Sequence, residues 1–464
     1  MAGTKGLALA IMLVLCLGDT HAVIPGSVVR ITQKGLDYAL QKGMTILKEQ
    51  LSKLSLPDIT GTYKAFLGNI HYSFSSLVIS SFQQSNSQVS LVPGVGLKLT
   101  ILGSFIQVDG QKKIRFSFLS DDGTFNVKME DLTISIVLKL GNDGQGRPTA
   151  LSSDCSSHIK DLKVQMPGKF GWVVKLFHDK VSSELKTNIE QQICPAVTDL
   201  IRDKLKPFLE TIPVIAKIDE VAAIDYSLTA PPNVTTDFVE VYLKGEVFDL
   251  SNRIAAPYSP PSLSLPMENN LMVYFGAANY LFNTAAFVYY SAGALVFNVT
   301  DDMIPKDFQI RLNTTYIGAL IPQVLQYPNM LMKLKISSST APYLTIKPGN
   351  LTLSPVIAVQ AYALLPNSSL TSLFLLNVTT DALVRLKVNS SRIVGNLELK
   401  KIEMTLVHSD VGPFSVELLN VALNYYIINI LLPRINVHLM NGYPLPLLDN
   451  IQISDIFLQP QEVS

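Results

Sequence analysis

The sequence predicts an α+β protein with two domains of similar architecture, each built from long antiparallel strands that wrap around long apolar helices. Alternating polar and apolar runs divided by turn residues indicate the strands, and apolar residues at three- and four-residue spacing indicate the helices. A proline-rich stretch separates two such patterns, which indicates two domains. The chain of 464 residues exceeds one typical domain, and its 48% hydrophobic content supplies a large apolar interior.

Residues 1–22 have the features of a secretory signal peptide. Lys5 supplies a basic start, the run GLALAIMLVLCL is too short to span a bilayer, and Ala22 is a small residue suited to cleavage before Val23. Later apolar stretches are interrupted by Glu and Asn, so no transmembrane helix is expected. We therefore expect a secreted protein. The formal net charge of zero argues against nucleic acid as a partner.

The first elements expected after the signal peptide are an amphipathic helix and a twisted antiparallel meander. Apolar residues at three-, four- or seven-residue spacing predict the helix over 26–54, closed by Pro57. Long strands joined by short turns are typical of a meander. Its strands are expected at 70–82, 95–108, 112–119 and 123–140, with turns at Pro93-Gly94, Asp109-Gly110 and Asp121-Asp122-Gly123.

The stretch IQVDGQKKIRFSF, residues 106–118, predicts a β-hairpin. An Asp-Gly pair between alternating runs is a strong hairpin signal, so the turn is expected at Asp109-Gly110. Lys112, Lys113 and Arg115 would then lie just past an exposed tip. A solubilising strand tip and a site for an anionic partner are both compatible with this pattern.

A second long helix is expected from Gly171 to about Leu209, with a kink or interruption at Pro195. Its predicted apolar stripe contains Val174, Phe177, Val181, Leu185, Ile189 and Ile193. Once Cys16 leaves with the signal peptide, Cys155 and Cys194 remain. In an oxidising compartment one disulfide is the simplest arrangement, and two free thiols are the alternative. The bond would join helix to sheet.

The proline-rich linker spans 251–266 and divides an N-terminal domain, 23–250, from a C-terminal domain, 267–464. The second domain repeats the pattern of strands, with a short helix near 315–326 and a longer one within 412–442. Residues 201–228 and 435–458 both pass from a helix end through Pro into a strand. This similarity indicates a duplicated domain.

The sequence contains no motif of a known catalytic or metal site, so neither an enzyme nor a metal protein is expected. N-x-S/T sequons occur only in the later half and predict a glycosylated C-terminal half. The apolar helices either cover a sheet or leave a tunnel for acyl chains. The expected glycosylation sites are Asn233, Asn298, Asn313, Asn350, Asn367, Asn377 and Asn389.

Several segments resemble the family of bactericidal/permeability-increasing protein and lipopolysaccharide-binding protein, the former most closely. The resemblance covers essentially the whole mature chain in order, and cholesteryl ester and phospholipid transfer proteins fit less well. The segments are GSVVRITQKGLDYA, VPGVGLKL, SDCSSHI, KGEVF, MVYFGAANYLFNTAAFVY, DDMIP, YPNM, LLPNSSLTSLF and GPFSVELL.

The resemblance implies an elongated boomerang of two barrels joined by a central sheet, with a phospholipid pocket in each barrel. It also implies a disulfide between Cys155 and Cys194, and binding of the lipid A part of lipopolysaccharide by basic residues at the N-terminal tip. The residues expected to pair with its phosphates are Lys64, Lys98, Lys112, Lys113 and Arg115.

One departure from the family is expected to weaken the binding of lipopolysaccharide. The bacteria-killing member carries a Trp among many basic residues at this tip, whereas the sole Trp here is Trp172. We predict a monomeric, secreted innate-immunity protein, with granule storage as a further option, that binds lipopolysaccharide at the Gram-negative outer membrane and neutralises it. The alternatives are a phospholipid carrier without bactericidal action and a protein that presents lipopolysaccharide.

Overall fold

The N-terminal sheet of the computed structural model consists of long antiparallel strands, and their order is β2-β4-β6-β7-β8, with β3 and β5 paired to β4 and β6. Apolar residues alternate with polar ones along each strand, and the apolar set faces inward. The strands are β2 (Ser55–Leu56), β3 (Ile59–Ala65), β4 (Gly68–Gln83), β5 (Asn86–Val92), β6 (Gly96–Phe116), β7 (Leu119–Asn142) and β8 (Pro148–Gln165).

The structure describes residues 24–51, 55–66, 68–83, 86–168, 171–304, 306, 311–389, 391–445, 456 and 458–461.

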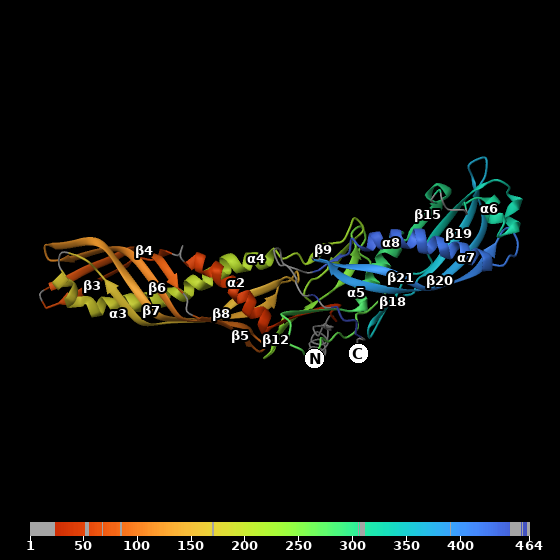
Figure 1. The fold of residues 1–464 in the computed structure, drawn as a ribbon. Helices are drawn as coiled ribbons and strands as arrows, with labels where there is room; N and C mark the ends of the chain where they lie inside the picture. Colours follow the sequence, from red (N-terminus) through yellow and green to blue (C-terminus); the bar gives the residue numbers. More distant parts are fainter. Residues whose placement is uncertain are drawn as a thin grey trace, which may run out of the picture.

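A long helix closes the open side of this sheet. Helix α3 (Gly171–Leu200) contacts both β8 and β3, which lie at opposite edges of the sheet. The helix continues through Pro195, and the irregular turn comes later, as a π-helical segment at Ile201–Leu205 followed by α4 (Lys206–Glu210). Sheet and helix together form one half-barrel, at the left of Figure 1.

The predicted hairpin turn at Asp109-Gly110 is wrong, because β6 runs without a break from Gly96 to Phe116. Gly110 is paired with Phe125 in the middle of the sheet. A Cβ on this glycine would lie 2.7 Å from the side chains of both Leu77 and Phe125, so close packing explains the residue. The true turn is at Ser117 and Phe118, where Ser117 has a φ of 54°.

The predicted turn at Asp121-Asp122-Gly123 is also wrong, since these residues belong to β7. By contrast, the turn after Pro93-Gly94 is confirmed, and Gly94 has a φ of 72°.

The predicted helix over 26–54 begins later than expected. Residues Ser27–Thr32 form strand β1, and helix α2 spans Gln33–Leu51. The run Val28-Val29-Arg30-Ile31 favours a strand, because β-branched side chains fit a pleated surface. Strand β1 pairs with β12 (Phe238–Leu243) on one side and with β14 (Val273–Ala277) on the other.

The middle of the molecule is built from strands on both sides of the proline-rich stretch. One sheet has the order β11-β12-β1-β14, with β11 at Asn233–Val234, and a second has the order β13-β10-β9. Helix α5 (Asn279–Ser291) packs on β13 and β10. The second sheet contains β9 (Ile215–Lys217), β10 (Ala222–Asp225) and β13 (Glu246–Asp249).

Residues 251–272 contain no helix or strand and are here called the strap. Arg253, near its start, bonds to Asp225 and forms an ion pair with Glu246. Near its end, Arg30 of β1 donates to the carbonyl oxygens of Leu265 and Pro266. The strap is therefore held to the central sheets at two points. The domain boundaries at 250 and 267 remain predictions.

The C-terminal half repeats the design of a sheet covered by a helix. Its sheet has the order β15-β16-β19-β20-β18-β17, with β21 paired to β20 and β22. The predicted helices are confirmed at α6 (Thr314–Gly318) with the 3-10 turn Pro322–Gln326, and at α7 (Glu417–Tyr426), the π segment Ile427–Leu431 and α8 (Leu432–Leu439). The strands are β15 (Val296–Thr300), β16 (Leu331–Ser338), β17 (Leu344–Lys347), β18 (Asn350–Leu353), β19 (Val356–Leu364), β20 (Leu370–Asn389), β21 (Arg392–Ser409) and β22 (Tyr443–Pro444).

The whole molecule is elongated and gently curved, with one helix-covered sheet at each end and the small sheets between them (Figure 1). In the second copy of the predicted repeat, 435–458, residues 446–455 and 457 lie outside the described residues.

Candidate lipid-binding site

The end of the N-terminal sheet that lies farthest from the centre is formed by two neighbouring turns, here called the distal tip. The β3–β4 turn contains Phe66, and the β6–β7 turn contains Ser117 and Phe118. Pairing of Ile70 with Phe116 places the two turns side by side at the left end of Figure 1.

Three of the predicted cations lie on the outer face of this tip. Lys64 of β3, Lys113 and Arg115 of β6 are exposed. The register aligns Arg115 with His71 of β4, and His71 with Thr62 of β3, two residues before Lys64. None of the three cations forms an ion pair with another described residue. They are therefore available to an anionic ligand.

Lys112 points the other way, into the barrel, because neighbouring residues of a strand face opposite sides. Its Nζ lies 2.8 Å from Oδ2 of Asp121, and the two side chains are 0% and 8% exposed. This buried ion pair leaves Lys112 unable to reach an external phosphate. The predicted group of three adjacent cations is thus reduced to Lys113 and Arg115.

Lys98 is exposed but lies near the other end of β6, opposite Ser90 and Val137. At about 3.3 Å per residue, the distance along the strand to the tip is on the order of 50 Å. Lys98 cannot share one lipid headgroup with Lys113.

The strongest features of the tip that the sequence did not reveal are Phe66 and Phe118, which are 102% and 91% exposed. In the sequence, Phe118 continues the alternation of Ile114 and Phe116, so it resembles another core position. Only the position of the turn, after Phe116, shows that it projects outward. Ser117 has a positive φ in the structure, but the sequence Ser117-Phe118 contains no Gly, Pro, Asn or Asp to mark a turn.

The inside of the half-barrel is apolar. The predicted stripe of α3 is confirmed for Leu185, Ile189 and Ile193, which are buried against the sheet together with Val197. The side chains of Val174, Phe177 and Val181 lie outside the described residues. A small cavity of about 20 Å³ remains between α3 and the sheet, lined by Leu56, Ile79, Ile106, Val108, Met129, Ile134, Ile189, Ile193 and Ala196.

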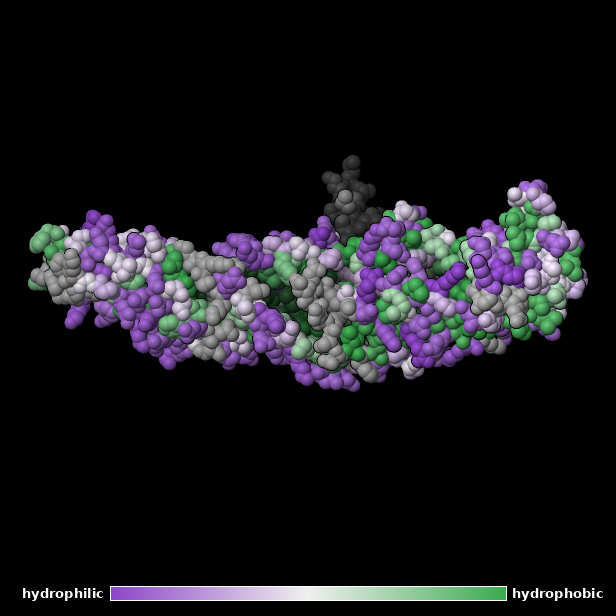
Figure 2. All heavy atoms as spheres, turned by 45° about the horizontal axis from the view of Figure 1, so that its top comes forward, coloured by the Kyte–Doolittle hydropathy of each residue, from purple (hydrophilic) through white to green (hydrophobic). Residues whose placement is uncertain are grey.

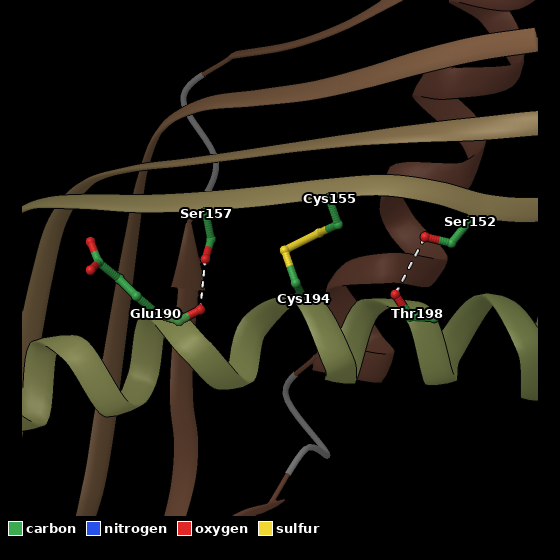
Figure 3. Close-up of a disulfide and its surroundings, with 6 residues drawn as sticks. All are labelled: Ser152, Cys155, Ser157, Glu190, Cys194 and Thr198. Atoms are coloured by element: carbon green, nitrogen blue, oxygen red, sulfur yellow. Dashed lines mark hydrogen bonds between the residues drawn. A yellow bond between two sulfur atoms is a disulfide. The ribbon is translucent and has the colours of Figure 1, made fainter.

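Helix α3 is fastened to β8 by covalent and polar bonds (Figure 3). The predicted disulfide between Cys155 and Cys194 is confirmed. On one side of it, the Ser157 hydroxyl donates to the carbonyl oxygen of Glu190 at 2.7 Å. On the other side, the hydroxyl oxygens of Ser152 and Thr198 form a hydrogen bond at 3.4 Å. Cys155 lies within strand β8.

Helix α3 is also joined to the other half of the sheet. On β4, next to the edge strand β3, the Tyr72 hydroxyl donates to Oε2 of Glu184. The helix is therefore fixed at β8, while near β4 this hydrogen bond joins it to the sheet.

The C-terminal half has a similar apolar interior, in which Leu419, Tyr426 and Ile430 of the covering helix are buried. By length and composition Glu417–Leu439 could cross a bilayer, and only 24% of its most apolar window is buried inside the protein. Since one face packs on the C-terminal sheet, the helix is a covering helix of this half.

The seven predicted glycosylation sites all lie at exposed or half-buried positions. The Asn313 side chain caps α6 by accepting from the backbone N–H of Tyr316. Among the described residues, no group of three or more His, Cys, Asp or Glu side chains is arranged to hold a metal ion.

Two family models together match most of the chain. They are described as the N-terminal domain of the LBP / BPI / CETP family, matching residues 35–207, and its C-terminal domain, matching residues 216–463. The chain belongs to the LBP / BPI / CETP family. Membership of this family establishes the α+β fold with two domains.

Relatives in this family match over nearly their full length. Human lipopolysaccharide-binding protein is 42% identical, with 97% of this chain and 95% of the relative covered. Rat bactericidal permeability-increasing protein is 37% identical, with 98% and 95% covered. A crystal structure of lipopolysaccharide binding protein matches with a TM-score of 0.63 at 39% identity, covering 93% of this chain and 96% of the other.

Proposed function

We propose that this chain is a secreted, monomeric innate-immunity protein that binds lipopolysaccharide at its distal tip. The observation that carries the proposal is the exposed group of Lys64, Lys113 and Arg115 at the end of a barrel whose relatives are named for lipopolysaccharide binding. Phosphates on the lipid A part would pair with these cations. Each exposed contact is weak, about 1 kcal/mol or less, and is screened by salt.

Apolar contacts would supply the remaining affinity. The cavity of about 20 Å³ under α3 has room for little more than one water-sized group, so an acyl chain would need the helix to move away from the sheet. The disulfide holds α3 to β8. Opening would therefore occur on the side away from β8, where Tyr72 of β4 bonds to Glu184.

A phospholipid carrier without antibacterial action is the second candidate. It is favoured by the wholly apolar lining of the cavity under α3 and by the apolar hollow near the middle of the molecule in Figure 2. In this version each barrel would hold a phospholipid, and the seven sequons would carry glycans that leave the N-terminal half bare.

The test is binding of the secreted chain to lipopolysaccharide and to neutral phosphatidylcholine vesicles, at low and high salt. We expect a preference for lipopolysaccharide that declines with salt. The variant Lys113→Ala with Arg115→Ala should weaken lipopolysaccharide binding about tenfold, since two contacts are lost. Lys98→Ala is the matched control, an exposed lysine far from the tip, and should bind like the wild type.

Equal binding of both lipids, or equal loss in the Lys98→Ala control, would contradict the proposed site. In that case phospholipid found by mass spectrometry of the purified protein would support the carrier. Amplified endotoxin signalling in host cells would instead support a protein that presents lipopolysaccharide.

A further inference from the structure

The helix that covers the C-terminal sheet carries a continuous row of exposed apolar side chains on its outer face. This helix runs from α7 through the π segment into α8, over Glu417–Leu439 (Figure 1). Side chains at three- and four-residue spacing lie along one side of a helix, and each member of the row is at least 49% exposed. The row, here called the outer row, consists of Leu418, Val421, Tyr425 and Ile428. The other side of the helix packs on the sheet, so the outer row takes no part in the core.

The covering helix of the N-terminal half has a polar outer face instead. Helix α3 buries one apolar side against its sheet, as the C-terminal helix does. Its exposed positions at the corresponding spacing hold Lys180, Ser183, Thr187 and Gln191. A covering helix therefore does not need an apolar outer face. Apolar side chains kept in a row at the surface indicate a face that contacts something else.

The predicted glycosylation sites leave this face bare. Glu417–Leu439 contains four Asn residues, yet none of them begins an N-x-S/T sequon. The sequons at Asn298 and Asn377 lie next to Val299 and Val378, which are buried in the core beneath the helix. Because neighbouring residues of a strand face opposite sides, these two Asn side chains point away from the helix. Glycans attached there would cover the opposite face of the C-terminal half.

The helix carries almost no charge, which favours an uncharged surface as its partner. Glu417 and Arg434 oppose each other in sign, and His438 is the one further acid or base among the 23 residues, tyrosines aside. Helices that bind anionic membranes carry many Lys and Arg residues on their polar face, and this helix does not. Beside the outer row, the Asn429 amide donates to the carbonyl oxygen of Tyr425 at 2.8 Å, so part of its hydrogen bonding is satisfied within the helix.

The size and shape of the outer row favour a lipid surface over a protein. Four partly exposed side chains fall well short of the roughly 800 Å² on each side that a stable protein partner needs. By length and composition the helix suits a membrane, but its inner side packs on the sheet, so it would lie flat in the interface rather than cross it. A half-exposed tyrosine suits the boundary between acyl chains and headgroups.

We propose that the outer row lays the C-terminal half of the protein on a lipid surface without net charge, such as one with phosphocholine headgroups. Leu418, Val421 and Ile428 enter the apolar boundary of that surface, and the helix axis lies parallel to it. The contact goes beyond the proposed function, because it needs neither the distal tip nor lipopolysaccharide. It is driven by apolar burial, so salt should not weaken it.

The experiment measures flotation of the full secreted chain with phosphatidylcholine vesicles at low and high salt. We expect binding that is equal at both salt concentrations. The double variant Val421→Ser with Ile428→Ser should bind at least about tenfold more weakly, because two apolar side chains lose their burial. The matched control is Val78→Ser with Leu151→Ser, which changes two exposed apolar residues of the N-terminal sheet and should bind like the wild type.

A fluorescent reporter measures insertion directly. The chain has a single Trp, so Tyr425→Trp in a Trp172→Phe background places the only indole in the outer row. Its emission should shift to the blue on adding phosphatidylcholine vesicles, and bromine-labelled acyl chains should quench it. Lys113→Ala with Arg115→Ala should leave this signal unchanged, which separates the helix from the distal tip.

Three results would overturn the proposal. The first is a wild-type chain that ignores phosphatidylcholine vesicles, and the second is a Val421→Ser, Ile428→Ser variant that binds them as well as the wild type. The third comes from sedimentation without lipid: a wild-type dimer that this variant converts to a monomer would show that a second copy of the chain covers the outer row.

Discussion

Neighbouring residues on strand β6 have opposite environments, although the sequence KKIR presents them as one basic run. Lys112 is buried with Asp121, whereas Lys113 and Arg115 face solvent. The alternation of a strand separates them by about 180°. A basic run on a strand therefore supplies about half of its charges to an external ligand.

Replacing Lys112 should damage stability rather than ligand binding. Lys112→Ala leaves Asp121 buried without its partner, and we expect a loss of about 3 kcal/mol in the free energy of unfolding. Lys113→Ala, the exposed neighbour, should change it by about 0.5 kcal/mol or less. Urea unfolding followed by circular dichroism checks both variants.

A double variant separates charge burial from loss of packing. Lys112→Met with Asp121→Asn removes both charges and should recover much of the stability lost in Lys112→Ala. Equal destabilisation by Lys112→Ala and Lys113→Ala would show that the ion pair does not stabilise the barrel.

At the scale of elements, both covering helices share an unusual break. Helix α3 passes through the π segment Ile201–Leu205 into α4, and α7 passes through Ile427–Leu431 into α8. In each case a proline, Pro207 or Pro433, follows the π segment by two residues. Proline cannot donate the usual backbone bond, which agrees with a wider turn before it. This shared break supports the duplicated-domain hypothesis more strongly than the segments 201–228 and 435–458 do.

The disulfide should stabilise the contact between α3 and β8. Cys155 and Cys194 are 39 residues apart in sequence, and replacing both with Ala should cost about 3–4 kcal/mol in the loop-entropy model. Denaturant unfolding gives this difference. Ser152→Ala is the control, because it removes the contact with Thr198 near the disulfide without removing the crosslink. A loss no larger than in this control would contradict the proposed role of the bond.

At the scale of the whole molecule, the two halves are joined by more than a linker. Strand β1, which precedes the N-terminal sheet in sequence, pairs with β14, which follows the strap. Arg30 on β1 forms an ion pair with Glu240 at 2.7 Å and also bonds to the end of the strap. The proline-rich stretch, predicted to be a linker between two domains, is thus part of the central layer.

The start of the strap depends on the charge of Asp225. Burial would raise the pKa of this carboxyl, but hydrogen bonds from Ser227 and Arg253 outweigh that effect and hold the pKa below its usual range. A lowered pKa means that the stabilisation is present above the unfolded pKa of about 4 and is lost as pH falls through the folded value.

We therefore expect Asp225→Asn to be less stable than the wild type at pH 7 by about 1–2 kcal/mol, since the Arg253 side chain is 45% exposed and screened by water. The difference should disappear well below pH 4. Thermal melts across this pH range measure it, with Glu268→Gln, an exposed carboxyl on the strap, as the control. A difference that persists unchanged at low pH would exclude the charge as its cause.

Periodicity within a segment allowed the sequence to determine the α+β class, the long strands, the inward stripe of α3 and the covering helix of the C-terminal half. Cysteine content also indicated the disulfide. These features depend on short-range spacing, which a sequence contains directly.

Tertiary structure decided the rest, because each remaining feature depends on a distant partner. Pairing with β12 and β14 makes Ser27–Thr32 a strand, and packing of Leu77 and Phe125 places Gly110 inside a strand instead of at a turn. Moving that turn to Ser117 and Phe118 buries Lys112 and exposes Phe118. The sequence alone therefore determined that the protein has a basic strand near a tip, and only the folded sheet decided which of its residues can touch a lipid.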